Sequence, residues 1–144
     1  MMLLEGNLRG VQHLGIPVCD IEKSKIFYSK FGFQKTMETE IKVEEGIIKI
    51  AFLQKEDFKI ELYQLTDKDL EEVRSRKNGH IDHIALDVED VEQAYQELKA
   101  AGFEVLEEAP VFLPLWENGV KYFNILGPDG EKIEFNQRLS NKNF

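Results

Sequence analysis

Apolar and polar residues alternate along residues 81–88, which is the pattern of a β-strand with one buried face. Ile84, Leu86 and Val88 lie on one face of this strand, and His83, Ala85 and Asp87 lie on the other. Residues 11–18 show the same alternation, and there the polar face begins at His13. Each strand thus places a histidine on the face that packing does not require. Two such strands indicate an internal repeat.

The repeat continues well beyond these strands without a gap. After each histidine an aspartate follows at seven residues, a glycine at nineteen and a phenylalanine at twenty. These residues are Asp20, Gly32 and Phe33 in the first copy and Asp90, Gly102 and Phe103 in the second. The aspartate is a good helix N-cap and the glycine a good helix stop, so each copy predicts a helix between them. Each copy then ends in a strand centred on a glutamate, Glu61 or Glu134.

Each copy is therefore predicted to be a βαβββ module. The expected strands are residues 10–18, 33–39, 47–54 and 58–65, followed by 81–88, 103–108, 120–126 and 131–138. Ile21, Phe27, Tyr28 and Phe31 are expected to form the buried stripe of the first helix. We predict an α+β fold in which tandem modules, residues 10–65 and 80–138 with a linker at 66–79, form a curved, partly closed mixed sheet with helices outside.

Composition limits the functions that this fold can serve. The chain has 144 residues, of which 42% are hydrophobic and 31% charged, as expected of one soluble domain. No apolar run is long enough to span a membrane, and the N-terminus lacks a secretory signal pattern. A net charge of -9 argues against nucleic acid as a partner. The single cysteine, Cys19, fits a reducing compartment, so we expect a cytoplasmic protein.

Four polar residues occupy equivalent positions in the two modules and are the candidate metal ligands. They are His13, Glu61, His83 and Glu134, and each lies on the face opposite the apolar one. Two imidazoles and two carboxylates suit one divalent transition metal, with Ni, Co or Zn expected first and Fe or Mn as alternatives. The third histidine, His80, falls before its strand and is interpreted as a linker residue.

Several motifs resemble the vicinal oxygen chelate superfamily, which includes glyoxalase I, methylmalonyl-CoA epimerase, extradiol dioxygenases, fosfomycin-modifying enzymes and bleomycin-binding proteins. The resemblance covers residues 10–138 and implies one domain of this superfamily. It is carried by the βαβββ duplication, the sequence HLGIPV at residues 13–18, DHIAL at 82–86 and GPDGEKIE at 127–134.

The resemblance also implies a function. Four ligands are typical of glyoxalase I and the epimerase, whereas the dioxygenases and fosfomycin enzymes use two His and one Glu. The implied activity is that of a glyoxalase I-like lyase or isomerase, the lactoylglutathione lyase type, acting by proton transfer through a metal-bound enediolate. Glu134 is the expected base, and Glu61 faces it as a second ligand and second candidate base. An epimerase, a non-catalytic small-molecule binder, and a two-His-one-Glu transferase or oxygenase are the alternatives.

Two positions bear on the thiol of the substrate. Glutathione-dependent glyoxalases have an arginine four residues after the first histidine and an asparagine four after the first glutamate. This chain has Pro17 and Leu65 there, so the thiol stays open. The expected partners are a small-molecule substrate and, as is frequent in the superfamily, a second copy of the chain in a homodimer.

Overall fold

The chain divides into two compact units, which are described separately. One comprises His13–Asp82, and the other comprises the residues before and after it. The computed structural model describes residues 2–76, 81–126 and 132–141. The boundary between the units falls within β1 (Leu8–Pro17), so this strand contributes residues to both. The module limits 10–65 and 80–138, with the linker at 66–79, remain a prediction based on the repeat.

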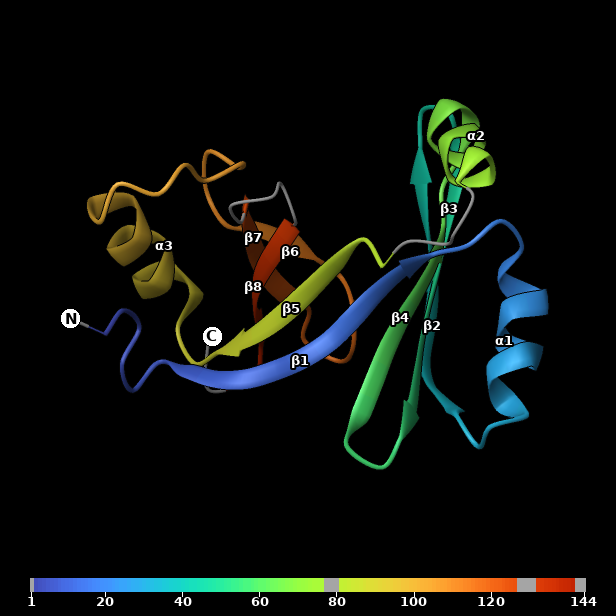
Figure 1. The fold of residues 1–144 in the computed structure, drawn as a ribbon, viewed down its shortest axis with the longest axis horizontal. Helices are drawn as coiled ribbons and strands as arrows, with labels where there is room; N and C mark the ends of the chain where they lie inside the picture. Colours follow the sequence, from blue (N-terminus) through green and yellow to red (C-terminus); the bar gives the residue numbers. More distant parts are fainter. Residues whose placement is uncertain (1, 77–80, 127–131, 142–144) are drawn as a thin grey trace. The chain divides into compact units, whose positions relative to one another are not determined.

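The first unit has a four-stranded half-sheet in the order β2-β3-β4-β1. After β1 come α1 (Ile21–Ser29), β2 (Gln34–Val43), β3 (Gly46–Lys55), β4 (Phe58–Gln64) and α2 (Asp67–Ser75). The strand β1 runs parallel to β4, and the other pairs are antiparallel. The helix α1 packs against β3 and β4 (Figure 1). In the core of this unit, Ile21 packs with apolar strand residues that include Leu53, Ile60 and Leu62.

The second unit repeats this arrangement in the order β5-β8-β7-β6. Its elements are β5 (His83–Val88), α3 (Val91–Ala100), β6 (Val111–Leu113), β7 (Val120–Leu126) and β8 (Lys132–Arg138). The strand β5 runs parallel to β8, as β1 does to β4. The helix α3 packs on β7 and β8 (Figure 1). Leu4 of the N-terminal arm is buried in the same core. The predicted α+β class with tandem βαβββ modules is confirmed.

The predicted helix signals are also confirmed. The Asp20 carboxylate accepts from the backbone N–H groups of Glu22 and Lys23, and the Asp90 carboxylate accepts from that of Gln93. Both stop glycines lie in the left-handed region, Gly32 at φ 90° and Gly102 at φ 91°, where a side chain would be strained. None of the helices in the described ranges combines the length and apolar character needed to cross a bilayer.

Two sequence-based expectations were wrong. Phe27 and Phe31 are more than half exposed, because Phe27 lies roughly 120° around α1 from the buried Ile21 and Phe31 follows the helix. Residues 103–108 are not a strand but make a single bridge, Val105 with Ile125. The Glu107 side chain accepts the Asn124 N–H that a strand carbonyl would otherwise take. The second strand of this module is β6 instead, within the apolar stretch 109–116.

A glutamine holds the start of each module's helix against its last strand. The Gln64 side chain accepts from the Ile21 N–H at 2.9 Å, and the equivalent Gln137 accepts from the Val91 N–H at 2.9 Å. Gln64→Leu leaves the Ile21 N–H without this acceptor, so we expect the free energy of unfolding in urea to fall by about 1–2 kcal/mol. Gln64→Glu keeps an acceptor, so its free energy of unfolding should fall less. Equal losses in the two variants would contradict the role of Gln64 as the acceptor for the Ile21 N–H.

Candidate metal centre

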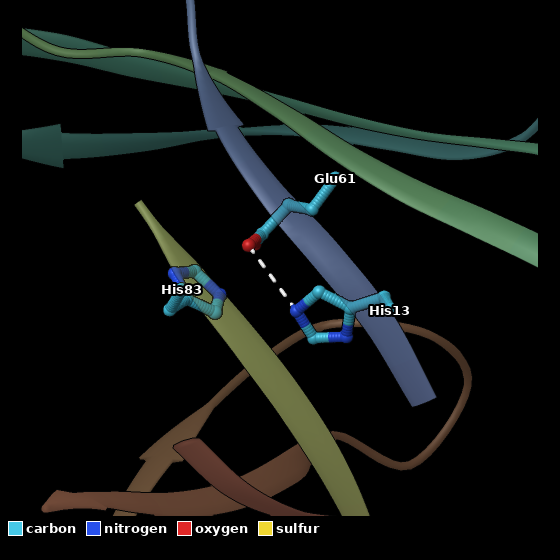
Figure 2. A group of neighbouring side chains, drawn as sticks. All are labelled: His13, Glu61 and His83. Atoms are coloured by element: carbon cyan, nitrogen blue, oxygen red, sulfur yellow. Dashed lines mark ion pairs between the residues drawn. The ribbon is translucent and has the colours of Figure 1, made fainter. Parts of the chain in front are cut away.

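The first pair of candidate ligands lies within the first unit. Leu14 and Ile16 of β1 pack towards the helix-side core, so His13 projects from the other face. His13 is 1% exposed, and its ring meets the Phe52 ring edge-on. Its Nε2 lies 3.4 Å from Oε1 of Glu61 on β4 (Figure 2). Both residues are buried, so this pair is not a surface ion pair.

The second unit contains the same pair. His83 at the start of β5 and Glu134 on β8 are both buried, and His83 Nε2 lies 3.5 Å from Glu134 Oε1. The separations in the two units differ by 0.1 Å and involve the same atoms. The four candidate ligands thus form two equivalent pairs, one within each unit.

A small residue stands at the same position beside each pair, and sequence reasoning missed it. Gly15 is the register partner of Glu61, and Ala85 is the register partner of Glu134. Both lie two residues after the histidine and therefore on its face of the strand. Aligning the two repeats would have shown it, because a small residue stands two positions after the histidine in both.

Polar side chains near the two pairs differ between the units. In the first, the phenol of Tyr63 is hydrogen-bonded to Asp82, and burial together with the Asp82 and Glu61 carboxylates raises the pKa of Tyr63. The phenol therefore stays neutral and donates its proton. In the second, the Asn136 side chain donates to Glu134 Oε2 at 2.9 Å. The repeat preserves the candidate ligands but not their neighbours.

One buried acceptor beside Glu134 lacks a partner. Asn124 on β7 is the register partner of Glu134, and its backbone N–H and Nδ2 both donate to the Glu107 carboxylate. This clamp fixes the side-chain amide, and Asn124 Oδ1 has no hydrogen-bond partner among the described residues. Leaving a buried acceptor unmet costs about 1–3 kcal/mol, which is hard to explain if this face of the sheet served only stability.

The donor chemistry fits a transition metal. Each unit offers one imidazole nitrogen and one carboxylate oxygen, and all four residues are at most 9% exposed. Buried carboxylates are normally paired or bound to metal, and the Nε2–Oε1 contacts show that each pair already directs its donors to a common point. Sets of imidazole and carboxylate ligands bind Zn, Co, Ni, Fe and Mn.

The apolar stretch 109–116 of the second unit does not belong to either pair. Within it Leu115 is buried, and the Arg138 guanidinium stacks 3.9 Å from the centre of the Trp116 ring. Cys19 is exposed and lies outside both pairs as well. The GPDGE segment, residues 127–131, that carried part of the resemblance lies outside the described residues.

Comparison with known proteins agrees with this fold. The chain is 37% identical over 131 residues to the uncharacterized protein YwbC of Bacillus subtilis (strain 168), covering 89% of this chain and 97% of that protein. A methylmalonyl-CoA epimerase structure from Mycobacterium tuberculosis superposes with a TM-score of 0.78 at 21% identity, covering 99% of this chain and 96% of that one. The hypothetical protein BH1468 from Bacillus halodurans C-125 gives 0.74 at 24%, covering 90% and 94%.

The family comparison covers most of the chain. Residues 10–135 match the sequence profile of the glyoxalase family, and the matched region contains both histidines and both glutamates of the two pairs. The predicted resemblance is confirmed: the chain belongs to the Glyoxalase/Bleomycin resistance protein/Dioxygenase superfamily.

Proposed function

We propose that this protein is a metal-dependent enzyme that moves a proton next to a carbonyl group. His13, Glu61, His83 and Glu134 would together hold one divalent ion. The observation that carries the proposal is the repeated contact between histidine Nε2 and glutamate Oε1, at 3.4 Å in one unit and 3.5 Å in the other. Two unrelated local roles would not reproduce the same buried pair at the same phase of both modules.

The metal has one task in this proposal. When bound, a Ni, Co or Zn ion (Fe or Mn as alternatives) supplies Lewis-acid stabilisation of negative charge on two neighbouring substrate oxygens. The histidines serve as neutral donors and fix its place. Their burial excludes bulk water, which strengthens every electrostatic interaction within the centre.

The glutamates carry the proton. A carboxylate bound to a metal is a poor base, so Glu134 would release the ion before it takes a proton from a C–H group beside the carbonyl. It would then return the proton to the neighbouring carbon, which is an isomerisation. Its carboxylate is buried, and a substrate on the same face of β8 would meet it. Glu61 is the second ligand and the second candidate base, because it occupies the equivalent position on β4.

A glyoxalase I-like isomerase is the reaction that these residues support first, because both modules supply a carboxylate. A methylmalonyl-CoA epimerase-like reaction is the second candidate, favoured by the epimerase structures of similar fold. That reaction would return the proton to the opposite face of the same carbon. Retention of both pairs argues against a purely non-catalytic binding protein.

The test uses protein loaded in turn with Ni, Co and Zn. We expect metal-dependent isomerisation of the methylglyoxal–glutathione hemithioacetal, followed by the absorbance of the thioester product, and none from the metal-free protein. A second outcome is that the protein converts methylmalonyl-CoA and not the hemithioacetal, which is measured as loss of chirality at the α-carbon. That result would transfer the assignment to the second candidate. Folded, metallated protein that converts neither this hemithioacetal nor other thiol adducts nor methylmalonyl-CoA would contradict the proposal.

A further inference from the structure

Asn136 holds one of the two oxygens of Glu134. It lies two residues after Glu134 on β8, so both side chains project from the same face of the strand. Asn136 is 4% exposed, and its Nδ2 donates to Glu134 Oε2 at 2.9 Å. The other carboxylate oxygen, Oε1, is the one that lies 3.5 Å from His83 Nε2. The two oxygens of Glu134 therefore face different partners.

The orientation of the Asn136 amide is itself fixed. Gln12 Nε2 donates to Asn136 Oδ1 at 2.9 Å, so the oxygen of the amide faces β1 and its nitrogen faces Glu134. Gln12 Nε2 also donates to Asp87 Oδ1 at 3.0 Å, which uses the second hydrogen of the group. Asp87 is fixed in turn by Arg9, whose Nε lies 2.7 Å from Asp87 Oδ2. Turning Asn136 over would place two oxygens against each other at Glu134.

The first module lacks this arrangement. The residue two positions after Glu61 is Tyr63, whose phenol is hydrogen-bonded to Asp82. A side-chain amide at this phase therefore occurs only beside Glu134. This difference breaks the equivalence of the two glutamates that the repeat otherwise maintains.

We propose that Asn136 is a positioning residue for Glu134, supported by Gln12. It fixes Oε2 so that Oε1 is presented, together with His83, to the metal. The inference rests on the proposed function only in requiring a metal at this centre, and it holds whichever substrate is turned over. Partners that orient metal-binding side chains commonly contribute 10–100-fold to metal affinity or activity.

The test measures Co²⁺ affinity by competition with a chelator, together with the visible spectrum of the bound Co²⁺. Asn136→Leu, which is of similar size but cannot donate, is expected to weaken Co²⁺ binding about 10–100-fold and to change the spectrum. Asn136→Ser retains a shorter donor and should recover part of the affinity. Asp20→Ala, which removes a helix cap remote from Glu134 in sequence, controls for lost stability and should leave Co²⁺ affinity unchanged.

The outcomes separate this inference from the proposed function. Wild-type protein that binds Co²⁺ but converts no substrate would overturn the reaction and leave the role of Asn136 intact. Asn136→Leu that binds Co²⁺ as tightly as wild type, with the same spectrum, would overturn the role of Asn136. If the leucine variant does not fold, undiminished affinity in Asn136→Ser and in Gln12→Leu would overturn it equally. Wild-type protein that fails to bind Co²⁺ would remove the centre and this inference together.

Discussion

We expect the wild type to bind one transition-metal ion per chain. His13→Ala and His83→Ala are each expected to abolish this tight binding. The two histidines come from different modules. If both pairs bind the same ion, losing either histidine disables the whole centre. Each substitution removes a ligand rather than a supporting partner. The affinity should therefore fall by more than the roughly 100-fold upper range of supporting contacts. Calorimetric titration of the metal-free protein with Zn²⁺ gives both stoichiometry and affinity.

The third histidine of the chain provides the matched control. His80→Ala makes the same chemical change outside the proposed ligand set, and its Zn²⁺ affinity should match that of the wild type. Two ions per chain, with each of the other substitutions removing only one, would show that the His–Glu pairs act separately. That result would overturn the proposal of a single centre.

The face on which each of the four candidate ligands lies could be predicted from the sequence because a strand has a strict period of two. Once the repeat is recognised, the alternation around His13 and Glu134 places each side chain on the face away from the helix-side core. The contacts from Nε2 to Oε1 within each unit follow from the parallel pairing of the first and last strands of a module. The repeat thus carried long-range information that neither strand carries alone.

The supporting side chains could not be predicted in the same way. Asn136 and Gln12 interact although 124 residues separate them, and nothing in the local pattern of either strand indicates the other. The same holds for Glu107, whose carboxylate accepts the Asn124 N–H in place of a strand carbonyl. Strand propensities cannot predict such a side-chain contact. Such contacts depend on side-chain placement across strands, whereas the ligands depend only on strand phase.

The choice of metal, the thiol, the homodimer and the cytoplasmic location stay predictions. They depend on groups outside the chain, and several metals accept the same imidazole and carboxylate donors. The positions of Pro17 and Leu65 bear on the thiol only through the resemblance. The substrate assays therefore decide more than any further reading of the ligands would.

Glu134→Gln is expected to lower kcat of the metal-saturated protein by about 10²–10⁴, the usual contribution of a general base. Glutamine keeps the size of glutamate and an oxygen for the metal but cannot accept the substrate proton at neutral pH. Metal affinity should therefore fall less than in His13→Ala. The direct measurement is exchange of the substrate's α-hydrogen with D₂O, followed by NMR, which reports proton removal even when product forms slowly.

The two glutamates are distinguished by the same measurement. Glu61→Gln should weaken metal binding but retain more of the exchange, because Glu134 still removes the proton. Glu92→Gln makes the same change at a carboxylate that pairs with Lys121 on the surface, and it should leave both quantities unchanged. Exchange that is lost in Glu61→Gln but kept in Glu134→Gln would make Glu61 the base. The Asn136 contact would then hold Glu134 as a metal ligand, and Glu61, which Tyr63 rather than an amide residue follows at this phase, would remove the proton.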